Sequence, residues 1–303
     1  MTRYRILSLD GGGIRGIISA TILERLEKIY PGFISEFELI TGTSTGGLIA
    51  LGLANGQTPS QIKELYKHLG PAVFSDSLAD DVNDIGTLIG AEYPIQPLKD
   101  VLTEKFSGIR LGQLHKRVLI PTFDLDNEVP DENRRMWKPK FFHNFRGHDS
   151  DENELVVDVG IRTCVAPTYF PIYQGFIDGG VVAGNPSVCA IAQALNPEGA
   201  GQKLSDIVLL SIGTGHNPKY VSSLDGDWGL VQWAPHIVQI MLEGGVGVAD
   251  YQSEQLLGVL YHRSNPVLHE AISMDRVDKI NRLLKIAENF NIDPTLEWIK
   301  RYF

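Results

Sequence analysis

The sequence predicts an α/β fold with a mostly parallel central sheet that is covered by helices on both faces. Short apolar segments of strand length alternate along the chain with longer segments whose apolar residues repeat at helical spacing. Apolar residues dominate these strand-length segments and do not alternate regularly with polar residues, which is typical of parallel strands buried on both faces. The chain has 303 residues, 43% of them hydrophobic and 21% charged, which suits a sizeable core and argues against a disordered protein.

Four segments are predicted as strands because they are short, apolar and rich in isoleucine, leucine and valine. In chain order they are 6–9, 37–40, 118–123 and 207–212. A glycine-rich turn directly follows each of the first two, and a helical pattern follows each turn. This strand–turn–helix order is typical of a parallel sheet.

The predicted helices are identified by apolar residues three and four positions apart, and Thr58 or Ser60 is expected to cap the third of them. In chain order they are 16–29, 48–54, 58–69, 231–242, 248–260, 277–287 and 294–301. The last part of the chain shows helical patterns only, and no linker or repeat sets it apart. We therefore predict a single domain over 1–303, with a core at about 4–215 and a helical part at about 228–303 packed on it.

The charge balance restricts the class of partner. The formal net charge is −10, from 27 Lys and Arg against 37 Asp and Glu, so we expect no nucleic-acid polymer and no attraction to anionic membranes by charge. No apolar stretch is long enough for a membrane span or a signal peptide. We expect a cytoplasmic protein that is capable of transient, peripheral contact with a membrane surface. Cys164 and Cys189 are too few for a disulfide framework and suit small buried side chains.

The acidic clusters lack the spacing of a metal site. Residues 124–128 begin like a calcium loop, but Val129 and Pro130 stand where a glycine and a carbonyl-donating residue are needed. The cluster at 149–154 lacks that spacing too, and no Cys/His set has zinc spacing. We therefore expect solvated loops here, with neither a metal nor a cofactor.

The segment 74–94 mixes apolar, acidic and turn-forming residues. It is either a mobile flap or an irregular surface loop. Its apolar residues Phe74, Leu88 and Ile89 either belong to the core or dip into lipid.

The segment Gly42-x-Ser44-x-Gly46 matches the nucleophile elbow, with an apolar strand before it and a helical pattern after it. A serine on such a tight turn projects its Oγ beyond the end of the sheet, and the flanking glycines let the backbone turn without a Cβ clash. The helix that follows presents free N–H groups and its positive end to the reacting oxygen. Because three fixed positions recur by chance in a chain with 31 glycines, the surrounding strand and helix carry the interpretation.

A second glycine-rich turn, DGGGIRG at 10–16, joins the first predicted strand to the first helix. Its N–H groups can bind an anion, which is either a nucleotide phosphate or the oxyanion of an acyl-transfer reaction. No Lys-[Ser/Thr] pair follows as in a P-loop, and no acidic residue suits a dinucleotide site at the end of the second strand. The neighbouring Ser44 favours the oxyanion.

A serine hydroxyl needs a base at neutral pH. The usual base is histidine, and among the eight histidines His216 follows the strand at 207–212 at a suitable place. Asp178, which ends a short apolar segment ahead of two glycines, can serve directly if burial raises its pKa. The residues alone leave both bases open.

The chain resembles the patatin-like phospholipase family in three motifs, which are DGGGIRG at 10–16, GTSTG at 42–46 and DGG at 178–180. Further stretches agree, namely TCVAPTYFP at 163–171, Asn185-Pro186 and SIGTG at 211–215. The motifs follow the family's order over about residues 4–262, so the combination is far more specific than any one of them. The resemblance implies a three-layer α/β/α fold and metal-independent hydrolysis of lipid acyl esters.

The resemblance also implies a role for each matching residue. Ser44 would be the nucleophile of a Ser-Asp dyad without histidine, and Asp178 would accept its proton and later activate water. The oxyanion hole would be formed by three N–H groups, those of Gly11, Gly12 and Gly13. Arg15 would either order the glycine loop or meet a lipid phosphate. The reaction would be of the phospholipase A or lysophospholipase type, through an acyl-serine intermediate.

Three alternatives stay open. One is a Ser-His-Asp esterase, and another is an acyltransferase, although acyltransferases with this layout are expected to have histidine where this chain has Thr43. The third is a nucleotide-regulated signalling or effector protein. Bacterial members of the family include effectors that are switched on by cyclic nucleotides or host factors, so a small-molecule or protein activator is compatible with the sequence.

Overall fold

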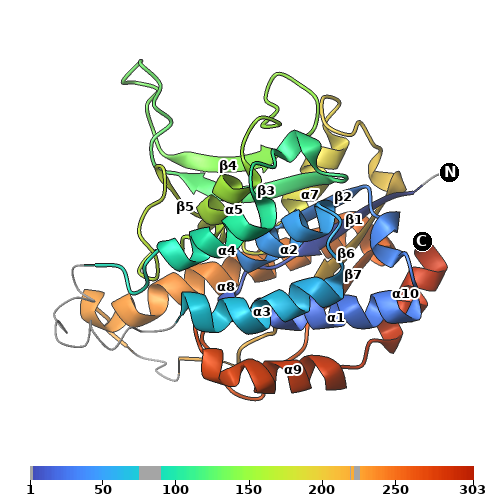
Figure 1. Ribbon diagram of the computed structural model, residues 1–303. Coiled ribbons are helices and arrows are strands. Elements are labelled where there is room, and N and C mark those ends of the chain that lie inside the picture. Colours follow the sequence, from blue (N-terminus) through green and yellow to red (C-terminus); the bar gives the residue numbers. More distant parts are fainter. Residues whose placement is uncertain (1–2, 75–89, 219, 222–225) are drawn as a thin grey trace.

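The computed structural model describes residues 3–74, 90–218, 220–221 and 226–303, and most of the predicted flap at 74–94 lies outside them. The described strands form one sheet in the order β4-β3-β2-β1-β6-β7, and β5 also pairs with β3 (Figure 1). The strands are β1 (Tyr4–Leu9), β2 (Leu39–Gly42), β3 (Arg117–Asp124), β4 (Lys138–His143), β5 (Phe176–Asp178), β6 (Ile207–Ile212) and β7 (Tyr261–Ser264).

The sheet is mostly parallel, as the sequence predicts. Strands β3, β2, β1, β6 and β7 run parallel to one another, whereas β4 and β5 pair antiparallel with β3. Every residue of β2 and β6 is buried, which accounts for their unbroken apolar sequences.

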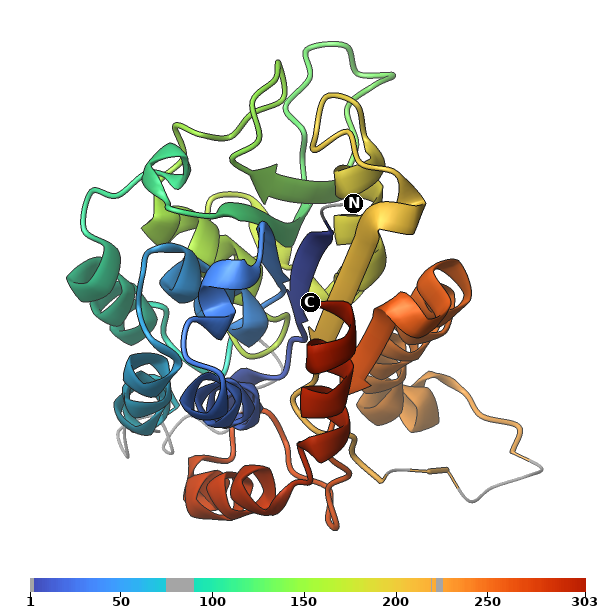
Figure 2. The same ribbon diagram turned by 90° about the vertical axis from the view of Figure 1, so that its right-hand side faces the viewer.

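Helices cover both faces of the sheet. The α-helices are α1 (Gly16–Ile29), α2 (Thr45–Ala54), α3 (Pro59–Val73), α4 (Gln96–Phe106), α5 (Val156–Cys164), α6 (Gly180–Ala183), α7 (Ser187–Leu195), α8 (Leu230–Leu257), α9 (Ile280–Asn289) and α10 (Asp293–Tyr302). Figure 2 shows α1, α2 and α3 on one side of the sheet and α7 and α8 on the other. The fold is therefore a three-layer α/β/α sandwich.

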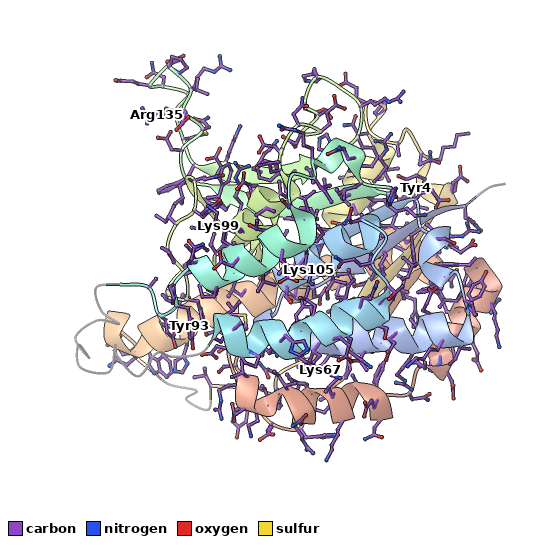
Figure 3. All side chains as sticks on the ribbon, in the orientation of Figure 1. Tyr4, Lys67, Tyr93, Lys99, Lys105 and Arg135 are labelled. Atoms are coloured by element: carbon purple, nitrogen blue, oxygen red, sulfur yellow. The ribbon has the colours of Figure 1, made fainter. Side chains whose placement is uncertain are left out.

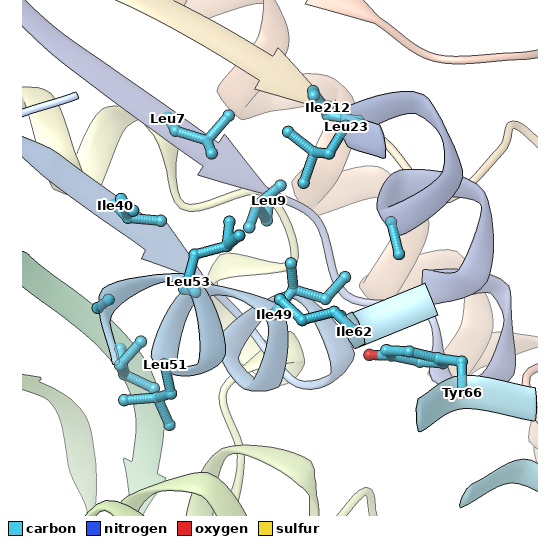
Figure 4. Packing of buried hydrophobic residues seen from close by; sticks show 14 of the residues in the cluster. Leu7, Leu9, Leu23, Ile40, Ile49, Leu51, Leu53, Ile62, Tyr66 and Ile212 are labelled. Carbon is cyan, nitrogen blue, oxygen red and sulfur yellow. The ribbon is translucent and has the colours of Figure 1, made fainter. Parts of the chain in front are cut away.

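Alternate residues of each strand supply the two cores. Leu7 and Leu9 of β1 pack with α1 and α2, while Ile6, which points to the opposite face of the sheet, joins the cluster formed with α7. Figure 4 shows the first cluster, in which Ile49 and Leu53 of α2 lie close to Leu9. This packing seats α2, and with it the turn that precedes α2, at the end of the sheet.

The acidic segments lie largely in surface loops. In the loop between β3 and β4, Asp126 Oδ1 accepts a hydrogen bond of 2.8 Å from Arg135 Nε, and Figure 3 shows Arg135 at the outer end of that loop. Asp124 differs because it is the last residue of β3 and is buried. Cys164 is buried as predicted, but Cys189 is only partly buried.

The prediction of a purely helical tail is wrong. Tyr261–Ser264 forms strand β7, which pairs in parallel with β6 at the edge of the sheet. Its four residues, YHRS, contain no aliphatic side chain, so the tertiary pairing and not the local sequence makes this segment a strand. The helices predicted at 231–242 and 248–260 are one continuous helix, α8, which passes through Gly244, Gly245 and Gly247 without a break.

One further boundary differs from the predictions, and one of the two predicted caps is confirmed. Strand β2 begins at Leu39 because Phe37 follows a 3₁₀ turn and packs edge-on against Phe33, with 5.0 Å between the ring centroids. Helix α3 is capped by Thr58, whose hydroxyl accepts the N–H of Gln61. No helix within the described ranges combines the length and the apolar content that crossing a bilayer requires.

Candidate active site

Ser44 lies on the turn between β2 and α2 in a backbone conformation that side chains rarely adopt, with φ 54° and ψ −126°. The turn is tight on both sides of the serine. A Cβ on Gly42 would lie 2.0 Å from the carbonyl oxygen of Gly46, and a Cβ on Gly46 would lie 2.3 Å from the carbonyl oxygen of Leu9. Both glycines are therefore required by close backbone approach, as the predicted elbow demands.

A threonine on α5 holds the elbow in place. The Ser44 N–H donates a hydrogen bond of 3.0 Å to Thr163 Oγ1, and the same hydroxyl donates one of 2.6 Å to the carbonyl oxygen of Pro121 in β3. Thr163 thus joins the strained turn to the neighbouring strand, which helps to hold Ser44 in its unusual conformation.

The register of the sheet brings Asp178 to Ser44. Strand β2 pairs with β3 as far as Thr41, which is opposite Leu119, and Ser44 follows three residues later. Three residues beyond Leu119, Thr122 of β3 is paired with Asp178. The antiparallel strand β5 therefore occupies the edge of β3 that β2 leaves free when the chain turns into α2, and its last residue lies beside the serine.

The environment of Asp178 suits a base. Its side chain is 4% exposed, and burial raises its pKa to about 6. A hydrogen bond of 2.6 Å from the Gly180 N–H to Oδ1 and the nearby Ser44 hydroxyl partly oppose this rise of the pKa. Ser44 and Asp178 thus line the same cleft, and the pKa of the Asp178 carboxyl lies just below neutral.

No histidine lies beside Ser44 in the position that a catalytic base would need. None of the eight histidines, all of which are described, lines either of the two clefts at Ser44. His216 instead continues the edge of the sheet through a parallel bridge with Val267, and its N–H donates to the carbonyl oxygen of Pro266. The structure therefore does not bring His216 to the serine.

The glycine-rich turn at 10–16 lies directly against the turn at Ser44. The N–H groups of Gly11, Gly12 and Gly13 are not equivalent. A Cβ on Gly11 would lie 3.4 Å from the Cβ of Ser44, which places this turn beside the serine. The N–H of Gly11 donates a hydrogen bond of 2.9 Å to the carbonyl oxygen of Gly184, so in this structure it is not free to bind an oxyanion. The N–H groups of Gly12 and Gly13 have no acceptor among the described residues.

Contacts from the C-terminal half of the chain fix the shape of this turn. Gly12 and Gly13 have positive φ angles of 156° and 58°. A Cβ on Gly12 would lie 2.3 Å from Thr214 Oγ1, and one on Gly13 would lie 2.3 Å from the carbonyl oxygen of Met274. Both positions therefore need glycine for conformational and for steric reasons.

Arg15 is buried with part of its guanidinium group unpaired. Its side chain is 7% exposed, its Nε lies 3.4 Å from the carbonyl oxygen of Gly12, and its Nη1 has no hydrogen-bond partner. Burial lowers the pKa of Arg15, and the carboxylates of Glu243 and Asp10 oppose that shift. The unpaired nitrogen makes this arginine a candidate for binding an anion.

Asp10, which directly follows β1, is fixed by an ion pair. Both of its carboxylate oxygens meet the guanidinium group of Arg263 on β7, with 3.2 Å between Nη1 and Oδ1. Arg263 Nη1 also donates a hydrogen bond of 2.6 Å to Ser211 Oγ on the intervening strand β6. The start of the glycine turn is thus tied to the edge of the sheet.

Two clefts meet at Ser44. The first has a cavity volume of about 50 Å³ and is almost entirely apolar; its lining includes Ile14, Leu48, Val73, Phe74, Leu98, Cys164 and Phe170. The second has a cavity volume of about 80 Å³ and contains charged groups; its lining includes Arg15, Asp178, Leu242, Glu243 and Val246. Tyr169 and Met274 line both clefts.

Several residues at this site were not predicted to belong to it. Thr163 and Tyr169 lie within the stretch 163–171, which supported the family resemblance but received no role. Met274 and Glu243 lie in the part of the chain at about 228–303, for which the sequence predicts only helices that pack on the core. Nothing in the local sequence marks these two residues, because their approach to Ser44 depends on the pairing of β7 and the packing of α8.

The chain is similar to several known proteins. A model of the family described as patatin-like phospholipase matches residues 7–188. The chain is 32% identical over 328 positions to Protein teg of Priestia megaterium, which covers 99% of both proteins. It is 32% identical over 267 positions to a Pseudomonas aeruginosa protein named cGAMP-activated phospholipase, covering 85% of this chain and 77% of that protein. The structure of VipD from Legionella pneumophila covers 94% of this chain and 67% of its own, with a TM-score of 0.40 and 13% identity.

The family match spans both glycine-rich turns and Asp178, and the relative from Priestia megaterium extends the likeness over nearly the whole chain. The chain therefore belongs to the patatin-like phospholipase family.

Proposed function

We propose that this protein hydrolyses fatty acyl esters of lipids through an acyl-serine intermediate on Ser44. Its family membership supports a lipid ester hydrolase. The observation that carries the mechanism is that the buried Asp178 carboxylate lines the same cleft as Ser44, and burial raises its pKa to about 6. At neutral pH such a carboxylate is mostly ionised and is more basic than an ordinary aspartate, so it suits proton transfer from the serine.

In the first step the Ser44 Oγ attacks the ester carbonyl carbon while its proton passes to Asp178. The tetrahedral intermediate collapses, the C–O bond to the alcohol breaks, and the alcohol leaves with the proton from Asp178. In the second step a water molecule attacks the acyl-serine and gives a proton to Asp178. This proton returns to Ser44 Oγ as the fatty acid leaves, so the enzyme is regenerated.

The free N–H groups of Gly12 and Gly13 are the proposed oxyanion donors. They lie on the turn that contacts the serine, and they have no acceptor within the described part of the protein. The start of α2, directly after Ser44, adds the positive end of a helix dipole to the same region. Loss of one such donor typically costs on the order of a hundredfold in rate.

The two clefts suggest how a lipid binds. The apolar cleft accepts the acyl chain, because almost all of its lining is hydrophobic. The charged cleft accepts the alcohol part of the substrate, and the unpaired Nη1 of buried Arg15 provides a hydrogen-bond donor for a phosphate there. A phospholipid, cleaved by an enzyme of the phospholipase A or lysophospholipase type, uses both clefts.

Helix α8 is the proposed point of contact with a lipid surface. It lines the charged cleft through Leu242 and Val246, and the same helix exposes large apolar side chains to solvent. Ile237 is 40% exposed and Met241, one helical turn further on, is 62% exposed. Because the protein is acidic, apolar insertion and not charge attraction would hold it at a membrane.

The decisive experiment measures fatty acid released from a lysophospholipid and a diacyl phospholipid, with the products identified by mass spectrometry. Ser44→Ala and Asp178→Asn are each expected to reduce release at least a thousandfold, because each removes a group that the first step requires. A fluorophosphonate probe should label the wild type and not Ser44→Ala. Unchanged turnover in either variant would contradict the Ser-Asp mechanism.

Two controls separate chemistry from folding. Ser35→Ala, in an exposed 3₁₀ turn, and Asp131→Asn, in an exposed loop, repeat the two substitutions away from both clefts and should keep full activity. The assay is repeated with EDTA, and we expect the rate to stay the same. Loss of activity on chelation, with recovery on adding a divalent cation, would contradict a metal-independent reaction.

A further inference from the structure

We propose that the charged cleft selects phospholipids whose headgroup carries an amine cation beyond the phosphate, with Arg15 binding the phosphate and Glu243 binding the amine. This inference rests on the proposed lipid hydrolase function and specifies its substrate class. It concerns the pair of opposite charges that the cleft holds beside Ser44.

The phosphate end of this subsite is the guanidinium group of Arg15. Arg15 lines the cleft, only 7% of the residue is exposed, and its buried Nη1 has no hydrogen-bond partner. A buried donor without a partner is uncommon and costs free energy unless a ligand satisfies it. A phosphate oxygen in the cleft would do so by a charge-assisted hydrogen bond.

The amine end is the carboxylate of Glu243 on α8. This residue lines the same cleft and attracts the Arg15 charge, but the two side chains do not form an ion pair. Both side chains line the cleft, so a ligand bound there can contact each of them. Gln239 Nε2, one turn earlier on the helix, donates a hydrogen bond of 2.9 Å to Glu243 Oε1 and so orients the carboxylate.

Close packing fixes the position of α8, and therefore of Glu243, relative to the reaction centre. A Cβ on Gly180 would lie 3.3 Å from Leu242 Cδ2, and one on Gly184 would lie 2.9 Å from Val246 Cγ2. Helix α6 thus presents small residues that let α8 approach Asp178 closely. Glu243 follows directly after Leu242, so its distance from the nucleophile is set by backbone packing.

The charges of the cleft explain the selectivity. Its ionisable lining consists of Arg15, Glu243, the catalytic Asp178 and Tyr169. A headgroup with a phosphate alone gains the attraction of Arg15 but meets the negative charge of Glu243 nearby. A phosphoethanolamine or phosphocholine headgroup places a cation against that carboxylate, and the ring of Tyr169 adds a surface suited to an alkylated ammonium group.

Glu243 also forms the outer boundary of the subsite. The same residue lines an adjoining surface groove together with Tyr220 and His236. Glu243 is therefore reached both from the cleft that holds Arg15 and from solvent. An amine at the far end of a headgroup can contact this carboxylate without leaving water entirely, which lowers the desolvation cost of binding it.

The test compares kcat/KM for phosphatidylethanolamine, phosphatidylcholine and phosphatidylglycerol with identical acyl chains, each diluted in neutral detergent micelles. The wild type is expected to favour the two amine lipids at least tenfold over phosphatidylglycerol. Glu243→Gln should remove most of this preference by raising KM for the amine lipids. Glu254→Gln, on the exposed surface of the same helix, changes the net charge equally and should keep the wild-type preference.

The outcomes separate this inference from the proposed function. If the wild type hydrolyses all three lipids at equal rates, or if Glu243→Gln keeps the preference, the headgroup assignment is wrong while the hydrolase proposal stands. If the wild type releases fatty acid from none of them and also fails to cleave a neutral monoacylglycerol, the proposed function itself is wrong. A preference that Glu254→Gln also abolishes would be an effect of net charge and would overturn the role of Glu243.

Discussion

Arg263 reaches across strand β6 to form a buried ion pair with Asp10, although 253 positions separate the two residues in the sequence. The crossing is possible because β6 presents the small Ser211 at this register, and Ser211 Oγ accepts a hydrogen bond from the same guanidinium group. Asp10 is the residue from which the glycine turn starts. The edge strand of the sheet therefore anchors the turn that lies against Ser44.

Replacing Arg263 should destabilise the protein strongly. In Arg263→Met the carboxylate of Asp10 stays buried without its partner, which typically costs about 3–5 kcal/mol of unfolding free energy. Denaturant unfolding of Arg263→Met measures this change. Arg276→Met removes an exposed ion pair with Asp278 and should cost less than about 1 kcal/mol. Equal destabilisation by the two substitutions would show that the Asp10 contact is unimportant.

The activity should depend on the exact shape of the glycine turn at 10–16. Gly13→Ala places a methyl group 2.3 Å from the carbonyl oxygen of Met274 and is expected to lower kcat at least a hundredfold, because the turn must shift. Gly108→Ala is the matched control, since Gly108 also has a positive φ, 71°, but has no heavy atom within 4 Å of its ideal Cβ. It should cost about 1 kcal/mol of stability at most and leave kcat unchanged. Similar kcat values for the two variants would contradict this account.

The activity should depend on the ionisation of Asp178. Its carboxyl must be deprotonated to accept the serine proton, and burial raises its pKa to about 6. The value of kcat/KM should therefore rise with pH through about 6 and reach a plateau above it. Steady-state rates with a soluble neutral ester between pH 4.5 and 8.5 measure this limb. A limb near pH 4, the ordinary range of an aspartate, would exclude Asp178 as the base.

The same group should also make stability depend on pH. Because the pKa of Asp178 is raised in the folded protein, the folded state binds more protons than the unfolded state between about pH 4 and 6. Its ionisation therefore lowers stability as pH rises through this window, and the penalty is complete above it. Asp178→Asn should be more stable than the wild type at pH 8, by on the order of 2 kcal/mol, and this advantage should vanish near pH 4. Thermal unfolding of both proteins at the two pH values measures the difference.

The exposed apolar face of α8 should contribute to membrane binding. The double variant Ile237→Ser and Met241→Ser is expected to reduce sedimentation with phosphatidylcholine vesicles about tenfold or more, because it removes two side chains that would enter the bilayer. Its activity on a soluble ester should match that of the wild type. Val259→Ser and Val267→Ser change two residues of comparable exposure, 68% and 60%, outside α8 and serve as the control. Equal vesicle binding by both double variants would argue against α8 as the contact surface.

The local parts of the site could be predicted from the sequence. The apolar strand, the glycine spacing and the following helix around Ser44 are neighbours in the chain, so they indicate the elbow directly. The glycine turn at 10–16 is equally local. The hydrogen bond from the Gly11 N–H to the carbonyl oxygen of Gly184 could not be predicted from this local sequence, because it joins segments far apart in the chain.

The distant parts of the site could not be predicted in this way. Asp178 was placed by resemblance, and its approach to Ser44 depends on β5 pairing with β3 beyond the end of β2. Arg263 lies in a strand with no aliphatic residue, which has no strand signal until it pairs with β6. Glu243 becomes part of the cleft only because α8 packs on the small residues of α6. In each case tertiary pairing, and not local preference, decides the position.

The contact of Gly13 with Met274 has a consequence for synthesis on the ribosome. A nascent chain that has emerged as far as residue 215 already carries Ser44 and Asp178, but it lacks the backbone carbonyl of Met274 and the ion-pair partner of Asp10. Ser44 is therefore synthesised long before the residues that shape the neighbouring glycine turn. The site at Ser44 takes its final shape only when the last part of the chain has folded.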